Sequence, residues 1–256
     1  HKRWKSLLLT QILLNLLLAS PSTAQVFMCS NVYAPYVIKK NDVAGGLFPQ
    51  IIQAVFQESG IRQEIKFLPW KRCELSVEQG ESFAAFPYLI TKYRAERFDF
   101  SEPIVYFYPS FFYKKESFPR EFIWQNLKDF HPYSIGGVRG YWYVEAFNEL
   151  GLNVEYVDSD QQNIQKLMLG RIHFTLIDKI VGKQLIEALY PNQALDFTST
   201  RKPESSNPFH LMISRKFPNY KTLTKKFNQG LKVIKSNGAY QKILQLNNVP
   251  IEYAVP

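Results

Sequence analysis

Side chains that commonly carry catalysis or bind metals are few and widely spaced in this chain. The four histidines show neither the H-x-x-x-H nor the H-E-x-x-H spacing of a zinc hydrolase. The sequence also has no G-x-S-x-G nucleophile turn and no phosphate-binding loop. Two cysteines cannot form a four-cysteine zinc site. We therefore expect no metal and no cofactor, and these classes of enzyme are disfavoured.

The two cysteines occupy positions that could bring them together. Cys29 falls at the end of a strand expected over residues 26–30, and Cys73 begins the helix after the second strand. In a parallel sheet both positions lie at the same carboxyl edge, and export to an oxidising compartment permits a disulfide. A disulfide and two buried free thiols both fit this placement.

Composition and charge describe a globular protein. Hydrophobic residues make up 46% of the chain and charged residues 21%, which excludes wholesale disorder and a polytopic membrane protein. The formal net charge is +9, but the basic residues occur in scattered pairs such as Lys114-Lys115, without a nucleic-acid-binding motif. We therefore expect no nucleic-acid partner. Aromatic residues reach 15%, which leaves some for a ligand surface beyond those in the core.

The first 24 residues have the layout of a secretory signal peptide. Lys2, Arg3 and Lys5 precede a mostly apolar run over residues 7–19, and small residues follow up to Ala24. The apolar run is shorter than the ~20 residues that a membrane-spanning helix needs. Cleavage after Ala24 would remove three basic residues and deliver the chain to the periplasm.

Two runs of alternating strands and helices must position any functional side chains. The first run has strands and helices expected over residues 26–30, 47–56, 65–68, 73–80 and 83–86. The second has them over residues 133–138, 143–150, 153–157, 161–169, 174–177 and 181–189. Strands that alternate with helices favour a largely parallel sheet. Two such runs predict an α/β protein with two lobes.

The segments around the second run predict how the lobes are joined. Residues 103–114 are aromatic and β-prone, which indicates an extended crossover strand, and residues 210–214 form a strand that returns after the second run. We expect lobe one to be discontinuous, with residues 25–107 and 209–256 on either side of lobe two at 108–208. A cleft between two α/β lobes, at the carboxyl ends of their strands, is a common place for small molecules to bind.

Several short motifs occur in an order that resembles a known family. They are Tyr33-Ala34-Pro35-Tyr36, Pro69-Trp70, Thr91-Lys92-Tyr93-Arg94, Phe100-Ser101-Glu102-Pro103 and Gly170-Arg171-Ile172. The ordered set resembles the periplasmic solute-binding proteins of polar-amino-acid ABC importers, over about the whole chain after residue 24. The resemblance implies the type II periplasmic-binding-protein fold, whose two lobes are joined by two crossover strands and close on a ligand. It further implies a monomer that passes a small molecule to an ABC permease.

The resemblance also implies which residues bind the ligand's charged groups. The arginine of the T-x-x-R segment, here Arg94 after Thr91, would bind the α-carboxylate of an amino acid. Asp178, at the end of the stretch that follows Gly170-Arg171-Ile172, would bind the α-amino group. A guanidinium suits a carboxylate because its planar donors match the two oxygens. Arg94 could instead be a surface ion-pair partner, and Asp178 could be the N-cap of the next helix.

Aromatic residues would form the walls of the same cleft. The resemblance implies that Tyr33 covers the ligand, that Trp70 lines the cleft, and that the turn with Tyr141 and Trp142 faces it from lobe two. Arg72 is a candidate for a second anion contact, although a solvated charge at a helix start is the simpler interpretation. Tyr33 and Trp70 could also be core residues.

Three departures from the family pattern affect the expected ligand. Pro87 stands where the family often has small hydroxyl residues, and it cannot donate an N–H. His173 replaces an acidic residue, and Gln50 stands where the first helix usually has aspartate. Two alternatives to an importer component stay open: a cleft enzyme on the same fold, for which Glu145 is the acidic residue near the lobe-two turn, and a ligand sensor that docks on a receptor.

Overall fold

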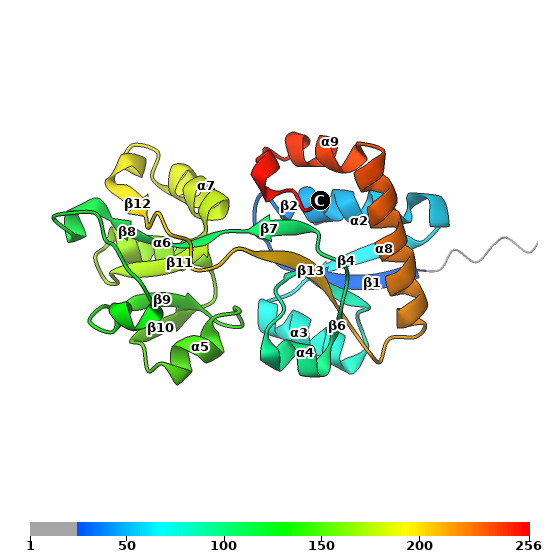
Figure 1. Ribbon diagram of the computed structural model, residues 1–256, viewed down its shortest axis with the longest axis horizontal. Coiled ribbons are helices and arrows are strands. Elements are labelled where there is room, and N and C mark those ends of the chain that lie inside the picture. The colour runs from blue at the N-terminus through cyan, green and yellow to red at the C-terminus, as the bar shows by residue number, and fades with distance from the viewer. Residues whose placement is uncertain (1–24) are drawn as a thin grey trace, which may run out of the picture.

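The computed structural model describes residues 25–256 and forms two α/β lobes (Figure 1). The predicted signal peptide, residues 1–24, lies outside the described residues. The two-lobed α/β architecture expected from the sequence is confirmed, with a six-stranded sheet in lobe one and a five-stranded sheet in lobe two. Within residues 25–256, no helix combines the length and apolar character needed to cross a membrane.

Lobe one is built on a mixed sheet with the strand order β4-β1-β5-β13-β6, and β7 pairs with β13. β1 runs parallel to β4 and β5, whereas β13 runs antiparallel to β5 and β6. The strands are β1 (Gln25–Ser30), β4 (Arg62–Phe67), β5 (Ala84–Tyr88), β6 (Asp99–Phe100), β7 (Val105–Phe107) and β13 (Asn207–Ile213). A hairpin of β2 (Ile38–Lys40) and β3 (Val43–Gly45) follows β1.

The helices of lobe one bury an apolar face in its core, except the short helix at residues 92–97, which buries only Arg94. They are α2 (Leu47–Phe56), α3 (Trp70–Gln79), α4 (Lys92–Arg97), α8 (Tyr220–Ser236) and α9 (Ala239–Leu246). In α8 the residues Leu223, Phe227, Leu231 and Ile234 recur at helical spacing and are buried. Phe227 packs against Phe56 of α2 with ring centroids 5.8 Å apart. The apolar residues that recur at helical spacing in the sequence therefore form the buried face of α8.

Lobe two has the strand order β10-β9-β11-β8-β12, parallel from β10 to β11 and antiparallel at β8 and β12. Its strands are β8 (Pro109–Lys114), β9 (Ile135–Val138), β10 (Val154–Val157), β11 (Phe174–Asp178) and β12 (Phe197–Ser199). Its helices are α5 (Val144–Glu149), α6 (Asp160–Met168) and α7 (Lys179–Leu189). Short 3₁₀ helices in the two lobes are η1 (Gln57–Ser59), η2 (Lys115–Ser117), η3 (Leu127–Phe130), η4 (Ala194–Asp196) and η5 (Ile251–Tyr253).

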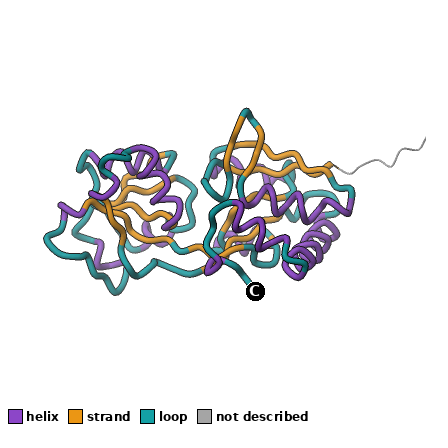
Figure 2. The backbone as a smooth tube through the Cα atoms, turned by 90° about the horizontal axis from the view of Figure 1, so that it is seen from above, coloured by secondary structure: helices purple, strands orange, loops and turns teal. Residues whose placement is uncertain are grey.

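The crossover between the lobes differs in detail from the expected single strand over residues 103–114. The segment forms two strands, because β7 pairs in lobe one and β8 pairs in lobe two. The break lies at Tyr108, whose backbone N–H donates to Asp178 Oδ2 at 3.1 Å rather than to a neighbouring strand. The second crossover, β13, pairs antiparallel with β7 from Asn207 to Phe209. Both connections therefore lie side by side between the lobes (Figures 1 and 2).

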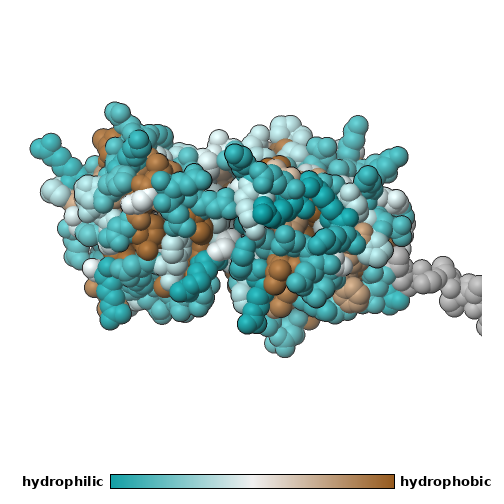
Figure 3. All heavy atoms as spheres, turned by 90° about the horizontal axis from the view of Figure 1, so that it is seen from below, coloured by the Kyte–Doolittle hydropathy of each residue, from teal (hydrophilic) through white to brown (hydrophobic). Residues whose placement is uncertain are grey.

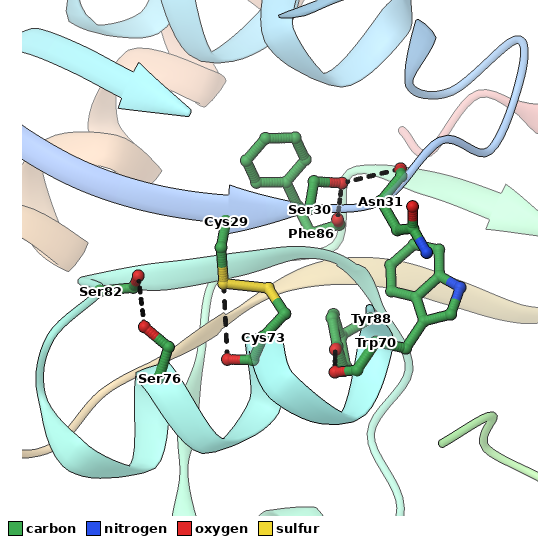
Figure 4. The surroundings of a disulfide bond; sticks show 9 residues. All are labelled: Cys29, Ser30, Asn31, Trp70, Cys73, Ser76, Ser82, Phe86 and Tyr88. Carbon is green, nitrogen blue, oxygen red and sulfur yellow. Dashed lines mark hydrogen bonds between the residues drawn. A yellow bond between two sulfur atoms is a disulfide. The ribbon is translucent and has the colours of Figure 1, made fainter. Parts of the chain in front are cut away.

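Cys29 and Cys73 are joined by a disulfide in the structure, which is the first of the two alternatives left open by the sequence (Figure 4). The bond links β1 to α3, and both residues are fully buried. Trp70 begins the same helix, and the Tyr88 hydroxyl donates to its carbonyl at 2.8 Å. The disulfide and this hydrogen bond together fix the first turn of α3 against the sheet.

Candidate functional site

A cleft between the lobes lies where β1 and β10 end. It has a volume of about 340 Å³ and takes its walls from both lobes. Lobe one contributes the segment after β1, Asn31 to Ala34, together with Trp70; lobe two contributes Tyr141, the start of α6 and the side of α7. A smaller cavity of about 30 Å³ adjoins it and shares Tyr33, Trp70 and Tyr141. The volume of the cleft falls in the range typical of small-molecule sites.

Three aromatic rings form the shared wall of these two cavities. Tyr33 and Trp70 come from lobe one and Tyr141 from lobe two, and their ring centroids lie 6.0 to 6.2 Å apart in edge-on arrangements. Local structure holds each ring: Tyr33 sits in a turn closed by two backbone hydrogen bonds with Val37, and Tyr141 follows Gly140, whose φ is +81°. Edge-on aromatic contacts of this kind are favourable beyond the area they bury. The two lobes therefore touch through their aromatic residues.

Arg94 is buried and held by partners on three sides. Its Nε donates to Glu74 Oε2 at 3.3 Å, and its Nη1 donates to the Leu89 carbonyl at 3.2 Å. The third donor, Nη2, reaches lobe two and donates to the Gly140 carbonyl at 3.0 Å. Thr91 caps α4, because its Oγ1 accepts the Arg94 backbone N–H at 3.2 Å. Arg94 thus lines the smaller cavity, shares the carboxylate of Glu74 with Lys71, and connects the two lobes.

Asp178 is fully buried at the end of β11 and caps α7. Its Oδ1 accepts the backbone N–H groups of Ile180 at 3.0 Å and Val181 at 3.4 Å, while Oδ2 accepts that of Tyr108. Burial raises the pKa of the Asp178 carboxyl to about 7, although the three backbone donors act in the opposite direction. The residues that line the cleft and the smaller cavity do not include Asp178. The structure therefore does not bring Arg94 and Asp178 into one cavity.

A second buried carboxylate, Asp160, was not anticipated from the sequence. It is the first residue of α6, follows the N-cap Ser159, lines the cleft and is 6% exposed. The Tyr141 hydroxyl donates to its Oδ2, while Oδ1 has no hydrogen-bond partner. Burial raises the pKa of this carboxyl to about 7, and the bond from Tyr141 lowers it in part. Its position, an acidic residue in the first helical turn beyond a strand end, was the available signal in the sequence.

Other polar atoms near the cleft are also unpaired. The hydroxyl of Tyr33 and the indole N–H of Trp142 are buried and have no hydrogen-bond partner. Trp142 lies beside Arg94 in the smaller cavity, and Pro87 lines the same cavity without an N–H to offer. Buried polar groups in native proteins nearly always have a hydrogen-bond partner. Unpaired groups around a cavity therefore indicate that a bound molecule supplies the missing partner.

Some of the residues singled out in the sequence lie elsewhere. Arg72 is exposed and lines neither the cleft nor the smaller cavity. Glu145 does not line the cleft or the smaller cavity, but it lines a third cavity of about 130 Å³ whose walls also include Arg94, Tyr141 and Trp142. His173 Nδ1 lies 2.8 Å from Ser134 Oγ at the edge of lobe two, away from the cleft. Within residues 25–256, no group of His, Cys, Asp or Glu could hold a metal ion.

Comparison with solved structures shows the fold. An ancestral arginine-binding protein bound to arginine aligns with a TM-score of 0.75 at 20% identity, over 88% of this chain and 98% of that one. A histidine-bound ABC uptake transporter substrate-binding protein from Streptococcus pneumoniae aligns with a TM-score of 0.78 at 18% identity, over 91% and 95%. A histidine kinase sensor domain similar to periplasmic binding proteins gives 0.77 at 17% identity, over 87% and 95%. The chain therefore has the type II periplasmic-binding-protein fold.

Sequence comparison assigns the family. No curated protein matches the chain. The model of the bacterial extracellular solute-binding proteins, family 3, matches residues 26–246, which include both lobes and both crossover strands. The protein belongs to family 3 of the bacterial extracellular solute-binding proteins.

Proposed function

We propose that this protein binds a small polar solute, an amino acid or an analogue of one, between its two lobes and delivers it to an ABC importer. The observation that carries the proposal is the cleft itself. Aromatic residues from both lobes meet there, and in the adjoining smaller cavity Arg94 of lobe one donates to the Gly140 carbonyl of lobe two. Contacts of this kind are made and broken when two lobes close and open about a hinge.

The contacts of Arg94 suggest how a ligand would enter this arrangement. Two of its donors are held by Glu74 and Leu89 within lobe one, and only Nη2 bonds to lobe two. When the lobes separate, Nη2 loses the Gly140 carbonyl and becomes free to bind a carboxylate. We propose that a ligand carboxylate occupies this donor, and that Trp142 donates its unpaired indole N–H to the same ligand.

Closure needs a hinge, and the paired crossovers supply one. β7 and β13 connect the two lobes side by side, and the break at Tyr108 lies between β7 and β8. A ligand held by both lobes binds the closed state better than the open one, so it shifts the open–closed equilibrium without any chemical step. We propose that the protein is a monomeric binder that acts in the periplasm after removal of residues 1–24.

Binding and closure can be tested on the chain without residues 1–24. The 20 amino acids and their decarboxylated amines would be screened by thermal shift, and positive compounds measured by calorimetry. We expect at least one of them to bind and to reduce the radius of gyration in solution scattering. Binding without a change in that radius would reject closure, and conversion of a bound compound into a product would favour an enzyme instead. Uptake of the compound by vesicles that contain an ABC permease encoded by a neighbouring gene would distinguish an importer component from a sensor.

A further inference from the structure

The charge balance around the cleft is acidic. Among the residues that line it, none is Lys, Arg or His, whereas Asp158 and Asp160 are both present. Asp158 is exposed and paired with Arg139 at 2.7 Å, so its charge is already balanced. Asp160 is buried and has no cationic partner within hydrogen-bond distance. One buried carboxylate at the cleft therefore lacks a counter-charge.

The cation nearest to the shared aromatic wall does not fill this role. Arg94 pairs with Glu74, which also pairs with Lys71, and two of the three guanidinium nitrogen atoms donate within lobe one. The guanidinium lines the smaller cavity and not the cleft that contains Asp160. A cationic ligand in the cleft would meet the carboxyl group of Asp160 and no Lys, Arg or His among the residues that line it.

Asp160 has one oxygen free to accept a hydrogen bond. Tyr141 donates to Oδ2, so the bond fixes the orientation of the carboxyl group and leaves Oδ1 unpaired. The rings of Tyr33, Trp70 and Tyr141 line the same cleft. Aromatic faces attract ammonium groups, and the attraction grows when the group is removed from water. An ammonium group in the cleft could therefore donate to Asp160 Oδ1 and contact the three aromatic rings.

We propose that Asp160 binds an ammonium group of the ligand, and that the cleft selects small organic amines whether or not they carry a carboxylate. The inference rests on the proposed function, since it concerns a ligand held between the lobes. The proposed site differs from one that must bind both the carboxylate and the ammonium group of an amino acid. An ammonium group alone can donate the hydrogen bond that Asp160 Oδ1 lacks.

Matched compounds test the inference on the unmodified protein. Each set contains an amino acid, the amine left by removal of its carboxylate and the acid left by removal of its amine. One set is L-phenylalanine, phenethylamine and 3-phenylpropionate, and the other is L-norleucine, pentylamine and hexanoate; calorimetry measures the affinity of each compound up to 10 mM. We expect the amine and the amino acid of at least one set to bind, and the acid of neither set to bind. A set in which the acid binds and the amine does not would overturn the inference but leave the proposed function standing.

A pair of variants then tests the residue. Asp160→Asn keeps the shape of the side chain and removes its charge, and we expect the affinity for the amine to fall roughly 30-fold or more. Asp196→Asn removes the same charge from an exposed position of lobe two, outside the cleft, and should leave the affinity unchanged within about threefold. An Asp160→Asn protein that is folded by circular dichroism and binds the amine as tightly as the unmodified one would refute the role of Asp160. If no compound of either set, no amino acid and no other amine binds at 10 mM, the inference and the proposed function both fail.

Discussion

The buried carboxyl of Asp160 should make the stability of this protein fall as the pH rises through the neutral range. Its pKa is about 7 in the folded chain, against an ordinary value of 3.8. Between these two values the folded state keeps a proton that the unfolded state has lost. The contribution of this proton to the free energy of unfolding is fully present below pH 3.8 and is lost as the pH rises through about 7. A difference of about 3 pH units corresponds to ~4 kcal/mol.

Comparison with Asp160→Asn isolates this contribution from the others. The pKa of Asp178 is raised in the same way, and burial lowers the pKa of His210, which contributes with the opposite sign. Both residues are present in the two proteins, so their contributions largely cancel in the difference. Urea unfolding followed by tryptophan fluorescence at pH 5.0, 5.5, 6.0 and 6.5 gives the slope of the unfolding free energy for each protein.

We expect the slope for the unmodified protein to be more negative than that for Asp160→Asn by about 1 kcal/mol per pH unit. Because the assay compares slopes, any fixed effect of the substitution on stability does not enter. The Asp196→Asn protein should have the slope of the unmodified protein. Equal slopes for the unmodified and Asp160→Asn proteins would show that the carboxyl of Asp160 titrates as in water, and the reasoning from its burial would be refuted.

Three further substitutions test the contacts that hold the cleft. Replacing both Cys29 and Cys73 by serine opens a loop with a sequence separation of 44, so we expect urea unfolding to show a loss of roughly 2–4 kcal/mol. Arg94→Met leaves the buried Glu74 with the exposed Lys71 as its cationic partner, so in the same assay it should cost less than the roughly 3–5 kcal/mol of a buried charge with no partner; adding Glu74→Gln should recover part of that cost, and no recovery would contradict a buried ion pair. Gly140→Ala places a Cβ at a φ of +81° and 3.2 Å from a backbone nitrogen of lobe one, so it should weaken lobe closure. Solution scattering at saturating ligand should then show a larger radius of gyration than for the unmodified protein, and an equal radius would argue against that contact.

The strands and helices could be predicted because their apolar residues recur at distinct periods. The apolar residues from Leu223 to Ile234 recur at helical spacing and predict a helix. The two runs of alternating strands and helices predict two α/β lobes. The split of residues 103–114 into β7 and β8 was not predictable in this way. Both halves are β-prone, and only pairing with distant strands, β13 for one and β11 for the other, decides which sheet each joins.

The functional side chains were predictable in type but not in their partners. Sequence position placed Arg94 and the aromatic residues at strand ends, yet nothing in the sequence indicated that Arg94 pairs with Glu74. Asp160 was missed because an acidic residue in the first turn of a helix is ordinarily solvated and favoured there by the helix dipole. Its burial depends on Tyr141, which follows a neighbouring strand and covers it. Such contacts arise from packing between elements, which local patterns do not encode.

The position of β13 in the middle of the lobe-one sheet has a consequence for how the chain can fold. Lobe two is formed by one continuous stretch between the crossovers, so its strands β8 to β12 are all available once residue 199 has been synthesised. Lobe one must wait for residues 207–213, because β13 lies between β5 and β6. Until then β5 has an unpaired edge, and an unpaired edge readily joins a strand of another chain. We therefore expect a chain that ends before β13 to keep a folded lobe two and to aggregate through the open edge of lobe one.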